Sequence, residues 1–397
     1  MKILVISMIL PWPQDEGARM RAGQTVRALC EAGDVDLYCI HGTSRTPEPP
    51  PVPSNLHLRR LRIQPRPAAG RWARRAWIRP GGPPQMVAGW KQSLRADLQG
   101  WADDPYDLAW IIRAAPPAAV GFPTACPVVV DLDDLEDQKA LERRATTTGM
   151  RSMTLRIDAA RWGRWQDRLA RKAVSVAICS QEDRARIGYP NAVVIPNGYE
   201  SAEPVVRAAA PGAGPPTLLL QGKLIRPPLL DAATILVRDV LPAVRRSLPE
   251  ATVDLVGTAD RRVRALAEFD GVRVHGRVEF MAPFLESAGL VAVPMRWGSG
   301  TRIKILEAFA HRIPVVASTI GAEGLDVVSG RHLLIADEPE AFAAACVQIL
   351  RDPDLARRLT DEAHALYEER YRWAPIRAQI GELARSVSAG ARVGRQG

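Results

Sequence analysis

Signatures of several enzyme and membrane classes are absent from this chain of 397 residues. Its five cysteines include no C-x-x-C pair, and no two of its six histidines stand at the spacing of metal ligands. The sequence has neither a G-x-S-x-G motif nor the residue order of a Ser-His-Asp triad, so hydrolase chemistry is unsupported. No apolar run approaches the roughly 18 residues that a helix needs to cross a bilayer. These absences predict a cytoplasmic protein with reduced core thiols, no metal ion and no membrane span.

Positive charge is the main bias in the composition. The formal net charge is +9, whereas the apolar content of 47% and the charged content of 24% are those of an ordinary globular protein. A basic chain favours anionic partners, which include nucleotide-sugars, lipid phosphates, acidic membrane surfaces and nucleic acid. The length is sufficient for two domains that each bury their own core.

The clearest pattern in the chain runs from Leu290 to Ser318. The apolar run Leu290–Met295 suits a buried strand. A loop punctuated by two glycines follows, and Thr301 can then cap a helix. Residues 313–318 predict the next strand, because Pro314 marks where the helix has already stopped. The segment is therefore predicted to be strand, glycine loop, helix and strand.

This arrangement favours the binding of an anion. Glycine lets the backbone approach a ligand closely, and the first turn of a helix offers unpaired N–H groups at the positive end of its dipole. Arg302 and Lys304 add two cations to that turn, and Glu307 projects from a nearby face of the same helix, where its carboxylate can accept hydrogen bonds from two ribose hydroxyls. An ordinary solvated turn with a Lys–Glu pair remains the alternative. The loop is neither a Walker loop nor a dinucleotide fingerprint, which needs a third glycine.

The run GSGTRIKILEAFA, followed by PVVAS and then GAEGL, resembles the donor-binding segment of the family-4 (group 1) retaining glycosyltransferases, in the branch with the pattern G-x-G-T-R-x-K-x-x-E. The resemblance implies that Lys304 lies near the diphosphate of a nucleotide-sugar and that Glu307 binds its ribose. The residues that it places against the diphosphate are Gly300, Thr301 and Arg302. Many members carry a second glutamate where this chain has Ser299, so the resemblance leaves the sugar open.

Two further motifs lie in the first half of the chain. Pro11, Pro13, Gly17 and Arg21 match the family pattern P-x-P…G-x-x-x-R, and V-I-P-N-G, which ends at Gly198, matches the signature that closes the first domain. The resemblance implies that Gly17 lies against the donor and that Arg21 lies on the acceptor side. A turn between a strand and a helix, with exposed arginines, is the alternative.

Carboxylates follow another predicted strand, at 127–130. Ligands of open α/β sheets bind at the carboxyl ends of the strands, and family members place a residue that contacts the sugar or the acceptor near here. We therefore predict an acceptor-side role for Asp131 and Asp133, and a catalytic role for Asp133. Capping of the next helix is the alternative.

Arginine and tryptophan are interleaved between Arg66 and Arg79. This composition suits a membrane interface or a phosphate-bearing acceptor. A plain basic surface is the alternative. Single-stranded nucleic acid is a third possibility, which no nucleic-acid motif in the chain supports.

A stretch rich in alanine, proline and glycine predicts a linker at 201–216 and a second domain after it. Family members place basic residues after the first strand of that domain to pair with the donor diphosphate, and they contact the base through the backbone after a later strand. The resemblance therefore adds four residues to the donor site, namely Lys223, Arg226, Arg277 and Val278.

Strands and helices alternate in both halves of the chain, which predicts an α/β protein with two doubly wound parallel sheets. The resemblance makes this the GT-B architecture, in which two Rossmann-like domains face a cleft. The predicted acceptor-side domain covers 1–200 and receives a crossover helix at 373–390. The predicted nucleotide-sugar-binding domain covers 217–372.

The predicted function is transfer of a sugar, with retention, from a nucleotide-sugar to an acceptor hydroxyl. UDP is the expected nucleotide, and no cofactor or metal is expected. The acceptor is a polysaccharide intermediate, a lipid-linked sugar or a natural product, and peripheral contact with an anionic inner membrane face is expected. The implied catalytic residues are Asp133, Lys223, Arg302 and Lys304. The alternatives are a catalytically silent GT-B subunit that binds a partner transferase or a lipid, and a GT-B glycoside phosphorylase.

Overall fold

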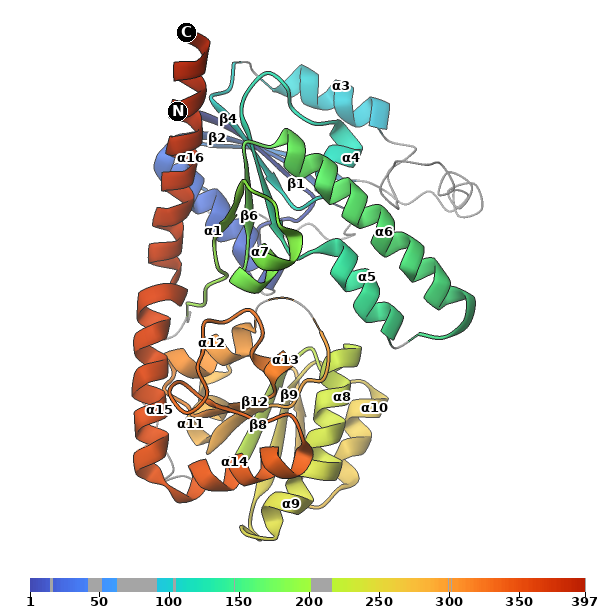
Figure 1. Ribbon diagram of the computed structural model, residues 1–397, viewed down its shortest axis with the longest axis vertical. Helices are drawn as coiled ribbons and strands as arrows, with labels where there is room; N and C mark the ends of the chain where they lie inside the picture. The colour runs from blue at the N-terminus through green and yellow to red at the C-terminus, as the bar shows by residue number, and fades with distance from the viewer. Residues whose placement is uncertain are drawn as a thin grey trace. The chain divides into compact units, whose positions relative to one another are not determined.

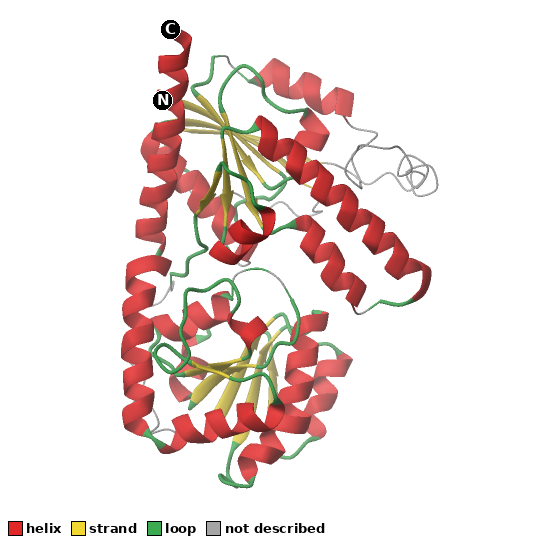
Figure 2. Cartoon of the chain, viewed as in Figure 1, coloured by secondary structure: helices red, strands yellow, loops and turns green. Residues whose placement is uncertain are grey.

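A computed structural model describes residues 1–14, 17–41, 52–62, 91–102, 105–145, 147–200, 216–298, 300 and 302–396. Strands and helices alternate along these residues (Figures 1 and 2). The chain divides into two compact units, of which the first is Met1–Pro196 with Ala374–Gly397 and the second is Asn197–Trp373.

The first unit is built on a parallel sheet, which has seven strands in the described part of the chain. Their order across the sheet is β3-β2-β1-β4-β5-β6-β7, and each neighbouring pair is parallel. The central strands contain long buried apolar runs, because helices cover both faces of such a sheet. The strands are β1 (Lys2–Ser7), β2 (Asp34–His41), β3 (Leu56–Arg62), β4 (Leu108–Ile112), β5 (Val128–Asp133), β6 (Ser175–Ile178) and β7 (Ala192–Val194).

The helices of this unit pack their apolar residues against the sheet. In α1, for example, Val26 and Leu29 are buried, and the helix ends just before Gly33. The helices are α1 (Gly17–Ala32), α3 (Lys91–Trp101), α4 (Pro116–Val120), α5 (Glu136–Ala145), α6 (Gly149–Lys172), α7 (Gln181–Ile187) and α16 (Trp373–Gln396). The last of these begins at the end of the second unit and continues in the first.

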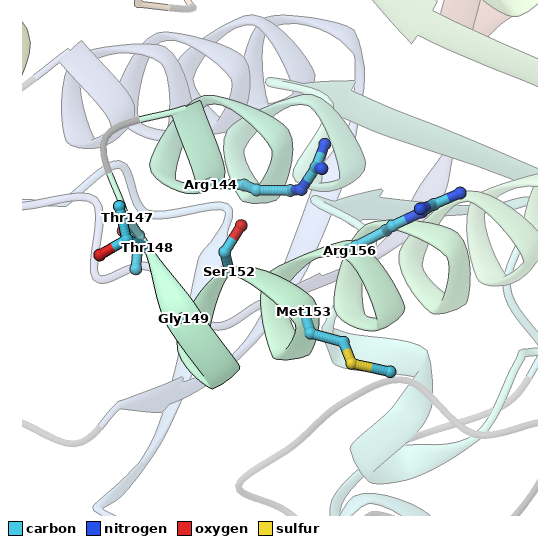
Figure 3. Close-up of a pocket in the computed structure, with 7 residues that line it drawn as sticks. All are labelled: Arg144, Thr147, Thr148, Gly149, Ser152, Met153 and Arg156. Atoms are coloured by element: carbon cyan, nitrogen blue, oxygen red, sulfur yellow. The ribbon is translucent and has the colours of Figure 1, made fainter.

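Helices α5 and α6 form an antiparallel hairpin that extends beyond the sheet (Figure 1). The turn that joins them borders an open hollow of about 440 Å³ (Figure 3). Its lining residues are Arg144, Thr147, Thr148, Gly149, Ser152, Met153 and Arg156.

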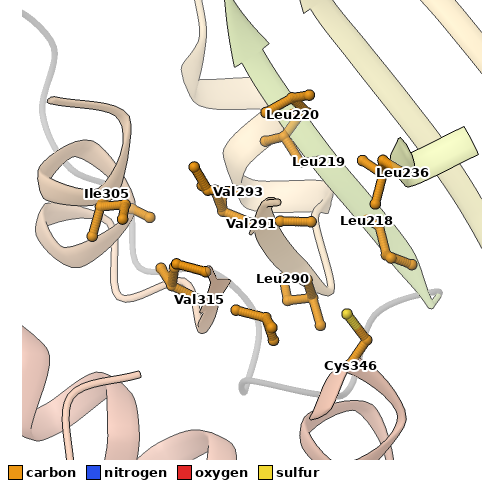
Figure 4. Close-up of a cluster of buried hydrophobic side chains, with 14 of the residues drawn as sticks. Leu218, Leu219, Leu220, Leu236, Leu290, Val291, Val293, Ile305, Val315 and Cys346 are labelled. Carbon is orange, nitrogen blue, oxygen red and sulfur yellow. The ribbon is translucent and has the colours of Figure 1, made fainter. Parts of the chain in front are cut away.

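The second unit has its own parallel sheet, in the order β10-β9-β8-β11-β12-β13. Its core is built from the short apolar strands at its centre and from the helices that cover them (Figure 4). Strand β8 contributes Leu218, Leu219 and Leu220, each with no exposed surface. The strands are β8 (Thr217–Gly222), β9 (Thr252–Gly257), β10 (Val272–Gly276), β11 (Leu290–Val293), β12 (Val315–Ala317) and β13 (Leu334–Ile335).

Several helices of the second unit carry proline in the first turn, where the missing N–H costs no hydrogen bond. The α-helices are α8 (Pro227–Ile235), α9 (Leu241–Arg245), α10 (Arg261–Arg264), α11 (Ala282–Ser287), α12 (Ile303–Ala310), α13 (Thr319–Ala322), α14 (Pro339–Arg351) and α15 (Pro353–Leu366). A 3₁₀ turn covers Ala265–Glu268, and π-helical turns cover Leu236–Val240 and Tyr367–Tyr371.

The two doubly wound sheets predicted from the sequence are confirmed. Some boundaries differ. Strand β5 continues to Asp133, so the predicted strand end at 130 was too early and both aspartates lie within the strand. Helix α12 begins at Ile303, with Arg302 at the N-cap; the residue that the sequence predicted as the cap, Thr301, lies outside the described residues.

The predicted linker 201–216, apart from its last residue, and the Arg/Trp stretch 66–79 lie outside the described residues. The first unit ends at Pro196, four residues before the predicted domain boundary. Within the described ranges, no helix is both long and apolar enough to cross a membrane.

Candidate functional site

The sheet of the second unit reverses its winding direction between β8 and β11. Strand β8 is the first strand of this unit in sequence, and its neighbours are β9 on one side and β11 on the other. Open α/β sheets bind ligands at the carboxyl ends of the strands at such a switch point. The residues that follow β8 and β11 here are Lys223 and the glycine loop. Gly257 permits the tight approach of β9, since a Cβ atom on it would lie 1.8 Å from the Gly222 carbonyl oxygen.

Arg302 connects the glycine loop to α13 through hydrogen bonds. Its side chain is 4% exposed, and its Nε and Nη2 atoms donate to the Ile320 carbonyl at 3.1 and 2.9 Å. Nη2 also donates to the Gly298 carbonyl at 2.6 Å. The sequence predicted Arg302 against a diphosphate, but its guanidinium donates to main-chain carbonyls of the loop and of α13. Arg302 therefore holds the loop against α13, and its Nη2 atom lies 3.9 Å from Glu323 Oε2.

Lys304 lies in the first turn of α12 and is half-buried. Its ammonium has no hydrogen-bond or ion-pair partner among the residues that the structure describes. Burial, followed by the positive charge of Arg302, lowers the pKa of Lys304 to about 8, while Glu307 opposes the shift. A cation in this position is destabilised in the empty protein, and an anion bound beside it would relieve that cost.

Glu307 is held by neutral hydrogen-bond donors. The Tyr199 hydroxyl donates to Oε1 at 3.2 Å, and the Gln221 Nε2 atom donates to Oε2 at 3.3 Å. Burial raises the pKa of Glu307, while the hydrogen bonds from Gln221 and Tyr199 and the charge of Lys304 oppose the shift. Gln221 is 3% exposed, and its buried Oε1 atom has no hydrogen-bond partner within the part of the chain that the structure describes. Because each Glu307 oxygen can accept further hydrogen bonds, the carboxylate suits a ligand that carries hydroxyl groups.

The other predicted donor residues lie at the same edge of the sheet. Lys223 follows β8 and is half-buried, and Arg226 is exposed at the start of α8. Arg277 is exposed directly after β10, and Val278 packs on the core of the unit. Gly300 has a φ of 86°, which favours glycine. Thr301 and Ser299 lie outside the described residues.

In the first unit, Arg21 is buried in an ion pair. Its Nη2 and Nε atoms donate to Asp131 Oδ1 at 2.9 and 3.0 Å, and its Nη1 atom donates to the Ile195 carbonyl at 3.0 Å. Burial opposes the charge, but Asp131 and its neighbours outweigh it and raise the pKa of Arg21. The alternative of an exposed arginine is therefore wrong. The predicted neighbour Gly17 is the first residue of α1.

Asp133 belongs to a second set of ion pairs. Its φ of 48° and the φ of 71° at Arg113 are both left-handed, which is uncommon for residues other than glycine. Arg113 Nη2 donates to Asp133 Oδ2 at 3.0 Å and to Asp134 Oδ2 at 3.1 Å, and Lys139 Nζ lies 2.8 Å from Asp134 Oδ2. Asp133 Oδ1 also lies 3.7 Å from Arg21 Nε, so the two sets of ion pairs are continuous.

The sequence did not single out Tyr199, Gln221 and Arg113 as site residues. Gln221 and Arg113 stand at or just after the ends of buried strands, which is the signal that led to Asp131 and Asp133. Tyr199 carries no such signal. Among the described residues, no group of three or more His, Cys, Asp or Glu side chains could hold a metal ion.

Comparison with known proteins shows which proteins this chain resembles. Residues 215–352 match the family described as Glycosyl transferases group 1. A phosphatidyl-myo-inositol mannosyltransferase from Mycobacterium leprae is 27% identical over 253 residues, which are 61% of this chain and 66% of that protein. The chain thus spans less than two thirds of the length of the curated relatives that it matches, the shares being 26–66%.

Two solved structures share the fold over nearly the whole chain. A sucrose-phosphate synthase from Thermosynechococcus elongatus has a TM-score of 0.69 at 19% identity, with 98% of this chain and 100% of that chain covered. Anabaena HepE in complex with UDP has a TM-score of 0.65 at 16% identity, with 97% and 100% covered. The chain therefore has the GT-B fold, and residues 215–352, which lie in its second unit, match the glycosyltransferase group 1 family.

Proposed function

We propose that this protein is a glycosyltransferase that moves a sugar from a nucleotide-sugar to an acceptor hydroxyl. One observation carries the proposal. A single helix, within the residues that match the group 1 family, carries the ammonium of Lys304, which has no partner among the described residues, and the carboxylate of Glu307, which neutral donors hold. A diphosphate would supply the missing anion, and a ribose would supply the hydroxyl donors.

The chemistry that these residues supply is electrostatic. Negative charge builds on the diphosphate as the sugar leaves, and preorganised cations stabilise that charge best where water is excluded. Lys304, Lys223 and the N-terminal N–H groups of α12 would act there, with Arg302 holding the loop. We extend the proposal to a UDP-sugar, because HepE of the same fold is in complex with UDP, and to retention of configuration.

Asp133 is the proposed catalytic residue on the acceptor side. Arg21, which is ion-paired with Asp131, lies next to it. The Asp133 carboxylate is ion-paired with Arg113 at 3.0 Å, and a paired carboxylate is a better hydrogen-bond acceptor than a base. Asp133 would therefore orient the acceptor hydroxyl. In this proposal the departing diphosphate itself receives the proton of the acceptor.

The test is thermal unfolding of the protein with UDP, GDP, ADP, dTDP or inorganic phosphate, on the wild type, on Glu307→Ala and on Glu340→Ala. Glu340 is an exposed glutamate of α14 in the same unit and serves as the matched control. A ligand that binds only the folded protein raises its unfolding midpoint. We expect UDP to stabilise the wild type and the control but not Glu307→Ala.

Other outcomes would favour the alternatives. Stabilisation by phosphate and by no nucleotide would indicate a glycoside phosphorylase. No stabilisation by any ligand would favour a catalytically silent subunit that binds a partner transferase or a lipid.

We also propose peripheral contact with an anionic membrane, through the tip of the α5–α6 hairpin. Residues 141–157 contain four arginines and one acidic residue. Four apolar side chains on this segment are exposed, and the two methionines among them are the most exposed large apolar residues in the described part of the chain. These side chains are Leu141 at 39%, Met150 at 89%, Met153 at 68% and Ile157 at 39%.

A basic surface with exposed apolar side chains is typical of segments that lie in a bilayer interface. Arg144, Arg151 and Arg156 are exposed and have no ion-pair partner among the described residues. Arg144 and Arg156 line the hollow of the hairpin together with the hydroxyls of three residues, a composition that suits a lipid phosphate (Figure 3). Charge complementarity therefore favours an anionic phospholipid surface as the occupant.

Sedimentation with vesicles of phosphatidylglycerol and phosphatidylcholine tests this contact. The double variant Arg151→Gln/Arg156→Gln should bind about 30-fold more weakly, since each arginine near such a surface contributes about 1 kcal/mol. The control Arg261→Gln/Arg264→Gln, on α10 of the second unit, should bind as the wild type does. Equal binding to pure phosphatidylcholine vesicles, or equal losses in both double variants, would contradict a contact at the hairpin.

A further inference from the structure

The chain passes between its two units twice, at residues 196–197 and 373–374, and the second unit joins the two crossing segments to each other. Tyr199, just after the first crossing, forms a parallel bridge with Arg372, just before the second. The Tyr199 N–H donates to the Tyr371 carbonyl at 2.9 Å. The main chains of the two segments are therefore hydrogen-bonded at this point.

Tyr199 also contacts the candidate donor site through its side chain. Its hydroxyl donates to Glu307 Oε1 at 3.2 Å, although the two residues are 108 positions apart in sequence. Its carbonyl accepts a hydrogen bond of 3.2 Å from the Tyr367 hydroxyl. One residue thus connects the carboxylate proposed to bind ribose with both crossing segments.

The second crossing segment has an unusual helical geometry at the same place. A π-helical turn, Tyr367–Tyr371, interrupts the helical run between α15 and α16 and packs against α12, the helix that carries Glu307. Turns of this kind are rare and occur frequently at functional sites. This turn directs Tyr367 and the Tyr371 carbonyl towards Tyr199.

We propose that Tyr199 is a positioning residue, which fixes the Glu307 carboxylate for the donor ribose and couples occupancy of the donor site to the two crossing segments. The inference rests on the proposed function, because it needs a nucleotide at Glu307. Ribose hydroxyls that bind Glu307 restrict the motion of its carboxylate. The Tyr199 hydroxyl is then held more firmly, and with it the main chain that bridges to Arg372.

Amide hydrogen exchange with and without saturating UDP tests the coupling in the wild type, Tyr199→Phe and Tyr367→Phe. Tyr199→Phe keeps the ring and removes only the hydroxyl that reaches Glu307. Tyr367→Phe is the matched control, because it removes a hydroxyl from the same junction that does not touch Glu307.

In the wild type, UDP should slow exchange in α12 and also at residues 197–200 and 367–373. In Tyr199→Phe, UDP should bind about 3- to 10-fold more weakly, as expected for one hydrogen bond, and at saturation it should protect α12 alone. In Tyr367→Phe, the crossing segments should exchange faster without ligand but should still gain protection from UDP.

The inference would be overturned if UDP bound Tyr199→Phe with unchanged affinity and protected the crossing segments of this variant as much as it protects those of the wild type. Equal loss of that protection in both variants would also overturn it, because the junction would then respond to any damage. No protection of α12 in the wild type by any nucleotide would refute the proposed donor site itself, and the coupling with it. The three results differ in which segments lose protection.

Discussion

The two sheets share the strand order 3-2-1-4-5-6 over their first six strands. They differ in how the charged side chains at the carboxyl ends of their strands are paired. In the first unit, the cations at this edge are paired with carboxylates. Arg21 is 1% exposed and bonds to Asp131, and Arg113 bonds to Asp133 and Asp134. These charged side chains therefore form ion pairs with one another within the protein.

At the corresponding edge of the second unit, Lys304 and Glu307 are the charged residues that we propose to bind a ligand. Lys304 has no partner among the described residues, and burial lowers its pKa to about 8. Glu307 accepts hydrogen bonds from a tyrosine and an amide, neither of which carries a compensating charge. A strand end rich in charge therefore does not by itself mark a binding site. We propose that the binding site is the edge where a half-buried lysine, Lys304, has no ion-pair partner among the described residues.

The largest expected effect comes from breaking the paired edge. Arg21→Met leaves Asp131 buried with no arginine bonded to it, and removal of one partner of a buried ion pair costs about 3–5 kcal/mol. We expect the free energy of unfolding of the first unit to fall by that amount, measured by hydrogen exchange of β4 and β5 in urea. Nucleotide affinity should not change.

The double variant Arg21→Met/Asp131→Asn separates the pair from simple packing. Because the second substitution removes the uncompensated charge, it should restore part of the lost stability. A loss below about 1 kcal/mol in the single variant would mean that water compensates Asp131, and the contrast between the two edges would weaken.

The unpaired edge should respond in the opposite sense. Lys304→Met removes a cation that burial destabilises, so the second unit should unfold at the same or a higher free energy, by about 1 kcal/mol. Affinity for UDP should fall about 10- to 100-fold, the range for hydrogen bonds to a charged group. Calorimetric titration and thermal unfolding measure the two quantities.

Arg302→Met is the matched control for Lys304→Met. Arg302 donates hydrogen bonds to the main-chain carbonyls of Gly298, in the loop, and of Ile320, in α13. Its removal should therefore lower the stability of the second unit. If Lys304→Met were the destabilising variant and Arg302→Met the neutral one, the assigned roles would have to be exchanged.

A pH titration sharpens the comparison further. Binding of a diphosphate needs the ammonium form of Lys304, whose pKa in the empty site is about 8. Affinity for UDP should therefore be constant near pH 7 and fall above about pH 8, by up to tenfold per unit. Calorimetry at a series of pH values measures this decline, and Lys304→Met should show none.

The same pKa predicts whether the free energy of unfolding rises or falls with pH. The unfolded chain titrates Lys304 near 10.5, so between pH 8 and 10.5 it binds more protons than the folded protein. The contribution of Lys304 to the free energy of unfolding should therefore rise across this window in the empty protein. A decline of that contribution, taken as wild type minus Lys304→Met, would contradict an uncompensated lysine.

A feature could be predicted from the sequence when the residues that form it lie close together along the chain. The strand, the glycine loop and the Lys304–Glu307 spacing lie within one short segment, so their juxtaposition follows from helix geometry alone. The order of strands followed from their alternation with helices. These features needed no knowledge of distant contacts.

The roles that were not predicted depend on distant partners. The hydrogen bonds from Arg302 to Ile320, for example, form only when the loop folds onto α13. Arg21 was left open as an exposed residue because its partner, Asp131, is 110 positions away. Tyr199 reaches Glu307 only because the crossing segment is anchored beside α12. No spacing in the sequence carries such information.

The smallest expected effect tests whether the paired edge also serves the acceptor. Asp133→Asn keeps a residue that tolerates the left-handed backbone, with its φ of 48°. It removes the charge that pairs with Arg113, which is 18% exposed. We expect the free energy of unfolding to fall by about 1 kcal/mol and UDP affinity to stay unchanged. The KM for the acceptor should rise about tenfold if one charge-assisted hydrogen bond is lost.

Asp134→Asn is the control that makes this result informative. Asp134 accepts from the same Arg113 nitrogen, at 3.1 Å, but lies beyond the end of β5. It should show a similar loss of stability without the change in acceptor KM. Equal KM changes in the two variants would mean that Asp133 acts only through Arg113. The carboxyl edge of the first unit would then serve to hold that unit together, and the acceptor would have to be bound by other residues.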